Sequence, residues 1–88
     1  MAYKLEVSKD AKADLSKLDK PILQAIRQRI LVLAENAEQV RHLPLKGKLA
    51  GLYKLRVYGK YRIIYDFQPE KQLIVVVRVG NRDNIYKE

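Results

Sequence analysis

Hydrophobic and polar residues alternate most regularly over residues 52–57. Because consecutive side chains of a β-strand point to opposite faces, this pattern predicts a strand with one apolar face and one basic face. Lys54 and Arg56 share the basic face. Residues 58–60 are typical of a tight turn, and residues 61–67 are expected to form the returning strand of a hairpin.

The remaining pattern predicts an α+β domain with the order β-α-α-β-β-β. Residues 2–7 alternate weakly, as in a short strand. Apolar residues at helical spacing then predict one helix that ends near Leu18 and a second that begins near Pro21. Residues 72–79 are apolar on both faces, which is typical of an interior strand. We expect an antiparallel meander of the last three strands, the N-terminal strand at an edge, and the two-helix hairpin packed on one face.

The 88 residues suffice for one small domain, and a single domain over residues 1–88 is expected. Residues 36–51 contain prolines and glycines and are predicted to form one long irregular segment. This segment holds the only histidine, His42, which is expected to be a surface residue. The chain has no cysteine, so thiolate and disulfide chemistry is excluded. No long apolar run or secretory signal is present, and a cytoplasmic location without membrane contact is expected.

Positive charge is concentrated in the second half of the chain. Residues 1–40 carry seven Lys and Arg against six Asp and Glu, whereas residues 41–88 carry eleven against four. This asymmetry suggests a polyanionic partner, either nucleic acid or an acidic protein segment. The alternative is an ordinary solvated basic surface, but the concentration of charge on predicted strands favours a binding function.

Three cations are expected close together on the outer face of the hairpin. Lys54 and Arg56 lie two residues apart, which on a strand is about 6.5–7 Å, and the returning strand adds Arg62. A solvated sheet face usually mixes charge signs, because like charges on neighbouring strands repel one another. The pattern therefore favours an anion site. Arg82, just after the last strand, either joins this site or simply pairs with Asp83.

Tyrosine accounts for six of the seven aromatic residues. Four tyrosines alternate with the basic residues, as aromatic rings do in sites that stack on nucleobases. Of these, Tyr53, Tyr61 and Tyr65 have the inward parity and are expected in the core, and Tyr58 lies in the predicted turn. Tyr86 either contacts a ligand or anchors the C-terminal tail.

Taken together, LKGKLAGLYKLRVYGKYRIIYDF and VVVRVGNRDNIY resemble the RelE/ParE superfamily of type II toxin–antitoxin toxins, and within it the RelE-like ribonucleases. The resemblance implies a toxin that acts as a ribosome-dependent endoribonuclease. Such an enzyme cleaves messenger RNA by attack of a 2′-OH on the adjacent phosphate and inhibits translation. No cofactor and no metal are expected.

The catalytic residues that the resemblance implies are Lys54, Arg56, Arg62, Arg82 and Tyr86. Further contacts with RNA or the ribosome are expected from Lys46, Lys48, Lys60 and Arg78.

The roles implied for these residues follow from their chemistry. Lys54 in its neutral form is expected to act as the general base toward the 2′-OH. Arg62 and Arg82 are expected to clamp the phosphate, and Tyr86 to stack on or orient the nucleotide. Many relatives carry a histidine where this chain has Asn81, so any acid–base role of that histidine is missing here.

The resemblance also implies partners. These are a cognate antitoxin with an acidic or amphipathic disordered segment, the ribosome with its mRNA, and operator DNA reached through the antitoxin. Two alternatives stay open: a ParE-like toxin that inhibits DNA gyrase without nuclease activity, and a non-catalytic basic nucleic-acid-binding module. ParE-like chains share the expected fold but lack this set of basic residues.

Overall fold

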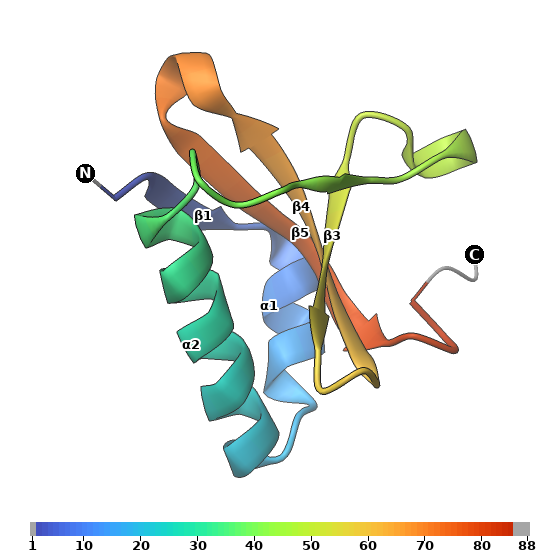
Figure 1. The fold of residues 1–88 in the computed structure, drawn as a ribbon. Coiled ribbons are helices and arrows are strands. Elements are labelled where there is room, and N and C mark those ends of the chain that lie inside the picture. Colours follow the sequence, from blue (N-terminus) through green and yellow to red (C-terminus); the bar gives the residue numbers. More distant parts are fainter. Residues whose placement is uncertain (1, 86–88) are drawn as a thin grey trace.

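A computed structural model of the chain describes residues 2–85, and Figure 1 shows its arrangement. The elements are β1 (Lys4–Val7), α1 (Lys9–Ser16), α2 (Lys20–Glu35), β2 (Leu43–Pro44), β3 (Tyr53–Val57), β4 (Tyr61–Gln68) and β5 (Leu73–Asn81). Two short 3₁₀ turns lie at Gly47–Leu49 and Pro69–Lys71. The predicted order is confirmed, with one additional two-residue strand.

The strands form one five-stranded sheet in the order β1-β5-β4-β3-β2. The last three strands make the expected antiparallel meander, and β1 lies at an edge, where it runs parallel to β5. Both helices cover the same face of the sheet (Figure 1). The predicted α+β fold class is therefore confirmed.

Ser8 fixes the start of α1 and ties it to the sheet. Its hydroxyl accepts a hydrogen bond from the Ala11 N–H at 3.0 Å and donates to the Val77 carbonyl at 2.8 Å. This is an N-cap arrangement, and it satisfies one of the free N–H groups of the first turn. The helix ends at Ser16, two residues before the predicted end at Leu18.

The core lies between the helices and the inner face of the sheet. Ile26 and Ile30 of α2 pack against Val57, Ile63 and Val79 of the strands, and all are at most 6% exposed. A second cluster lies toward the C-terminal end of α2. It comprises Tyr3, Leu33, Ala34, Ala37, Tyr65 and Ile74. These contacts define which side chains of β3 and β4 are left on the outer face, the face turned away from the helices.

Two segments differ from the sequence prediction. The long loop contains β2, which pairs with β3 through Leu43 opposite Lys54. β5 continues to Asn81, because β4 is long enough to pair with Gly80 and Asn81. Within residues 2–85 no helix is long and apolar enough to cross a membrane.

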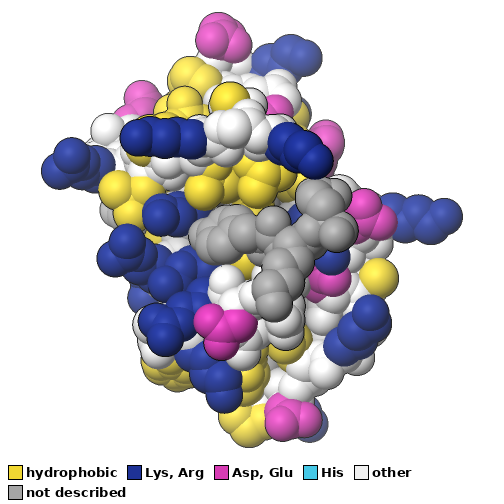
Figure 2. Space-filling model, turned by 90° about the vertical axis from the view of Figure 1, so that its right-hand side faces the viewer, with side chains coloured by type: hydrophobic (Ala, Val, Ile, Leu, Met, Phe, Trp, Pro, Cys, Tyr) yellow, Lys and Arg dark blue, Asp and Glu magenta, His cyan; other side chains and the backbone are white. Residues whose placement is uncertain are grey.

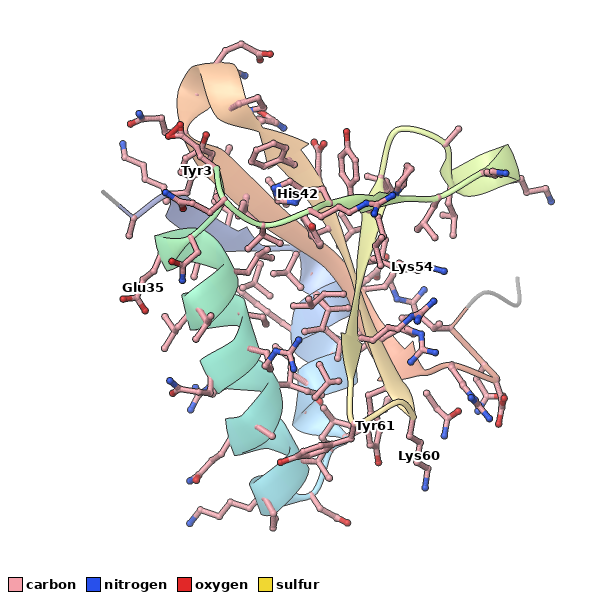
Figure 3. The ribbon with its side chains drawn as sticks, viewed as in Figure 1. Tyr3, Glu35, His42, Lys54, Lys60 and Tyr61 are labelled. Atoms are coloured by element: carbon pink, nitrogen blue, oxygen red, sulfur yellow. The ribbon has the colours of Figure 1, made fainter. Side chains whose placement is uncertain are left out.

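His42 was predicted to be a surface residue, but its side chain is half-buried and packed against the sheet. Its ring stacks on Phe67 with 3.9 Å between centroids, and its Nε2–H donates to the Ala37 carbonyl at 2.6 Å. Its Nδ1 lies 2.5 Å from the hydroxyl of Tyr65, and burial raises the pKa of Tyr65 to about 12. The protonated hydroxyl can therefore donate to Nδ1. His42 holds the loop against the aromatic end of the sheet (Figure 3).

Candidate active site on the outer face of the hairpin

Arg56 and Arg62 face one another directly across the β3–β4 ladder. Directly opposed residues of an antiparallel pair have Cβ atoms only about 4.5–5.5 Å apart. Arg56 is exposed and Arg62 is half-buried. The structure therefore places two of the predicted catalytic residues side by side on the outer face.

The guanidinium group of Arg62 is held beside the hairpin turn. Its Nη1 donates to the carbonyls of Gly59 at 3.1 Å and Tyr61 at 3.0 Å. Its other N–H groups make no hydrogen bond with the described part of the chain, so they are available to an anion. A guanidinium fixed in this way loses less side-chain entropy when it binds a phosphate.

Lys54 completes the cluster on β3. It lies two residues from Arg56 on the same face and opposite the buried Ile64, whose other neighbour is Arg78. Its half-buried side chain points away from the two helices (Figure 3). Among residues 2–85 its ammonium group has no ion pair. Asp66 lies two residues after Ile64 on β4. Its carboxylate accepts a hydrogen bond from the Gln68 amide at 2.7 Å and forms no ion pair with Lys54.

Arg82 lies beside the turn of the hairpin. Its backbone N–H donates to the Lys60 carbonyl at 2.8 Å, so backbone pairing across the hairpin turn continues one residue past the end of β5. Its Nε is 3.6 Å from Asp83, and both side chains are largely exposed. Exposed pairs of this kind contribute little, so Asp83 is a loose partner that leaves Arg82 available to an anion. The ammonium group of Lys60 lies 6.0 Å from the centroid of the Tyr61 ring.

The turn after β5 folds back over the outer face. The Ile85 N–H donates to the Asn81 carbonyl at 2.9 Å, and Ile85 packs on Gly80. Gly80 is the cross-strand neighbour of Arg62, so this turn lies next to the cluster. Tyr86, which the sequence assigned to the site, lies outside the described residues.

Arg78 is engaged in a structural ion pair. Its Nε is 2.8 Å from the carboxylate of Asp14, which also accepts the Val79 N–H at 3.0 Å. Burial raises the pKa of Asp14, but the hydrogen bonds from Arg78 and Val79 outweigh it and hold the pKa below its ordinary value. β1 pairs with β5 only as far as Val76, and beyond this point Asp14 provides the hydrogen-bond acceptor for the Val79 N–H. Sequence reasoning missed Asp14, because it lies 64 residues from Arg78 and no local pattern joins them.

Lys46 and Lys48 lie apart from this cluster, on the loop that carries the 3₁₀ turn before β3. Both are exposed, and the loop projects beyond the sheet in Figure 1. Figure 2 shows that Lys and Arg side chains gather along one side of this face, with few acidic side chains among them. We use the name basic cluster for Lys54, Arg56, Arg62 and Arg82. Lys60 borders it at the turn, and no group of His, Asp or Glu within residues 2–85 is arranged to hold a metal ion.

Comparisons with known proteins identify the class of molecule that carries this fold and cluster. Residues 5–86 match the family model described as ParE toxin of type II toxin-antitoxin system, parDE. The chain is 31% identical to Toxin RelG of Mycobacterium tuberculosis, with 99% of both proteins covered. It is 33% identical to a putative RelE-like toxin protein of Escherichia coli, over 94% of this chain and 86% of that protein.

The crystal structure of the toxin–antitoxin complex RelBE2 from Mycobacterium tuberculosis contains a similar fold. The TM-score is 0.82 at 30% identity, and the match covers 96% of this chain and 95% of that one. The chain therefore belongs to the RelE/ParE superfamily and is a RelE-like toxin of a type II toxin–antitoxin system.

Proposed function

We propose that this toxin is a ribosome-dependent endoribonuclease that cleaves messenger RNA and inhibits translation. The observation that supports it best is the direct opposition of Arg56 and Arg62, with Lys54 on the same face. Cations placed together without a neutralising carboxylate suit a group that carries negative charge. The phosphate at which an RNA chain is cut is such a group, and it gains charge in the transition state.

The chemistry needs no nucleophile from the protein, because the 2′-OH of RNA can attack the adjacent phosphate. Lys54 in its neutral form takes the proton of the 2′-OH as the oxygen–phosphorus bond forms. Arg62 and Arg82 hold the phosphoryl oxygens, and Arg56 adds charge beside them. The bond to the 5′ oxygen of the next nucleotide then breaks, and that oxygen takes up a proton from water. Tyr86 orients the nucleotide, and Lys46, Lys48, Lys60 and Arg78 contact RNA or the ribosome.

A cognate antitoxin is the expected regulatory partner. The solved relative is a complex of toxin and antitoxin. We expect a disordered segment of the antitoxin, acidic or amphipathic, to fold on this toxin, and the complex to reach operator DNA through the antitoxin. The activity requires access to mRNA on ribosomes, so we place it in the cytoplasm.

Inhibition of DNA gyrase is the second candidate, since the matching family description names ParE toxins. The two functions separate in one experiment. The toxin is expressed from an inducible promoter, and 5′ ends are mapped on translated messages and on copies without a start codon. New ends within codons only on translated messages support cleavage on the ribosome. Intact messages with arrested replication would favour inhibition of gyrase. Equal cleavage of both copies would show that cleavage does not require the ribosome.

A further inference from the structure

Tyr58 is the most exposed large hydrophobic side chain in the described part of the chain, with 73% of its surface accessible. It begins the turn between β3 and β4 and has a φ of +56°, followed by Gly59 at +67°. Bulky residues rarely adopt such angles, and turns with two successive positive φ values favour Asn-Gly or Asp-Gly. Neither burial nor backbone preference explains a tyrosine at this position.

The surroundings of Tyr58 point to a ligand that has both a flat ring and a negative charge. Tyr58 lines a hollow together with Gly59, Lys60, Arg82 and Asp83. Lys60 and Arg82 supply two cations, while the one carboxylate, that of Asp83, is 77% exposed and lies 3.6 Å from Arg82. The Gly59 carbonyl in the same turn holds the guanidinium group of Arg62. The hollow therefore shares Arg82 with the basic cluster and lies next to Arg62.

We propose that Tyr58 is a stacking platform for one nucleobase of single-stranded RNA, with Lys60 and Arg82 contacting the phosphate beside that base. An exposed aromatic ring among cations is the usual composition of a site for single-stranded nucleic acid. The inference rests on the proposed function, because it assigns this nucleotide to the same RNA chain that the basic cluster holds. Tyr58 positions the RNA and takes no part in the proton transfers.

Tyr58 also lines a second hollow, on α2, together with Pro21, Gln24 and Gln28 among others. A protein partner seated there would also contact the ring. The cations beside Tyr58 favour RNA, and the experiment below separates the two occupants.

The test uses a fluorescein-labelled decamer of 2′-O-methyl adenosine, which has no free 2′-OH to attack and so stays intact. Binding to the purified toxin is followed by fluorescence anisotropy at fixed ionic strength. Tyr58→Ala and Tyr58→Asn are expected to weaken binding roughly 5- to 150-fold, the range for the loss of one stacked base. Tyr58→Phe keeps the ring and should bind within about twofold of the wild type. Asn tolerates positive φ, so the melting temperature of Tyr58→Asn should not fall.

A decamer of the same length without bases serves as the matched ligand. It should bind the wild type and all three variants alike, because only the phosphate contacts remain. Equal binding of the adenosine decamer to Tyr58→Ala and wild type would overturn the proposal, as would a wild type that does not bind it. A loss seen equally with the baseless decamer would also overturn it. If the variants bind RNA normally and lose affinity only for the co-purified antitoxin, Tyr58 is a protein contact instead.

Failure of the proposed function gives a different result. In that case Tyr58-dependent binding of the decamer persists, but the wild type produces no breaks in translated messages.

Discussion

Arg56 and Arg62 are direct cross-strand partners on the outer face of the sheet, although both are positively charged. Like charges in this position destabilise an antiparallel pair. The hydrogen bonds from Arg62 to the carbonyls of Gly59 and Tyr61 draw one guanidinium toward the turn and reduce the repulsion. A phosphate bound to both guanidinium groups would offset the remaining repulsion. The arrangement is therefore unfavourable for the free protein and favourable for the complex with an anion.

Arg62→Ala and Arg82→Ala should each abolish growth inhibition. Loss of one charged contact to the transition state costs on the order of 3–4 kcal/mol, or about 10²–10³ in rate. Colony counts after induction and the yield of new 5′ ends measure the effect.

Arg29→Ala is the matched control, because Arg29 is an exposed arginine of α2 far from the outer face. It should remain toxic. Circular dichroism must show that all three variants fold, and full toxicity of folded Arg62→Ala and Arg82→Ala would remove both residues from the site.

Arg56→Thr should stabilise the protein while it weakens toxicity. It relieves the repulsion with Arg62 and places a β-branched residue on a strand, for a gain of about 0.2–1 kcal/mol in the free energy of unfolding. Urea denaturation at low salt measures the gain, which should shrink at high salt as charges are screened. A less stable Arg56→Thr would show that the two guanidinium groups do not repel one another.

Asp14 should make the stability of the toxin depend on acid pH. Its pKa is lowered in the folded state from an ordinary value of 3.8. A lowered pKa means that the stabilisation is complete above about pH 4 and is lost as pH falls through the folded pKa. Asp14→Ala also leaves the Val79 N–H without its partner, so it should cost about 1–3 kcal/mol at pH 7.

Urea denaturation at pH 7 and at pH 3 tests this expectation. The difference in the free energy of unfolding between wild type and Asp14→Ala should be smaller at pH 3 than at pH 7. Asp10→Ala is the control, because Asp10 is an exposed residue of the same helix. A difference that stays constant between the two pH values would contradict the role of the Asp14 carboxylate.

The hairpin and its cations could be predicted from the sequence because their geometry is local. Alternation over β3 and β4 determines which face Lys54, Arg56 and Arg62 share, and the short turn sets their register. The apolar stretch of β5 likewise indicated an interior strand. These features depend on neighbours within a few residues along the chain.

Other parts of the structure depend on contacts that no local pattern contains. His42 was predicted at the surface because it lies in a polar loop, but its partner Tyr65 is 23 residues away and draws it against the sheet. β2 has only two residues, too few to show any alternation. The parallel pairing of β1 with β5 joins the two ends of the chain.

Tyr58→Asn should raise the stability of the protein. The positive φ of Tyr58 costs on the order of 1–2 kcal/mol for an ordinary L-residue, and Asn carries less of this cost. We expect a gain of about 0.5–1 kcal/mol in the free energy of unfolding. Thermal denaturation measures it, with Tyr58→Phe as the control that keeps the backbone cost. A lower melting temperature for Tyr58→Asn would mean that the tyrosine ring stabilises the fold.

Binding of the antitoxin should depend on salt mainly through the association rate. Residues 41–88 carry eleven basic against four acidic residues, so an acidic segment is attracted over a distance set by ionic strength. That distance is about 30 Å at 0.01 M salt and about 8 Å at 0.15 M. The association rate should therefore fall several-fold between these conditions, whereas the dissociation rate, set by buried apolar contacts, should change little. Stopped-flow mixing with the co-expressed neighbouring protein measures both rates.

Lys54→Gln should slow association at 0.01 M salt more than at 0.15 M, while Lys9→Gln on α1 should have a smaller effect. If no adjacent small protein binds the toxin or neutralises its toxicity, the antitoxin proposal fails and a basic nucleic-acid-binding module becomes the better account of the cluster.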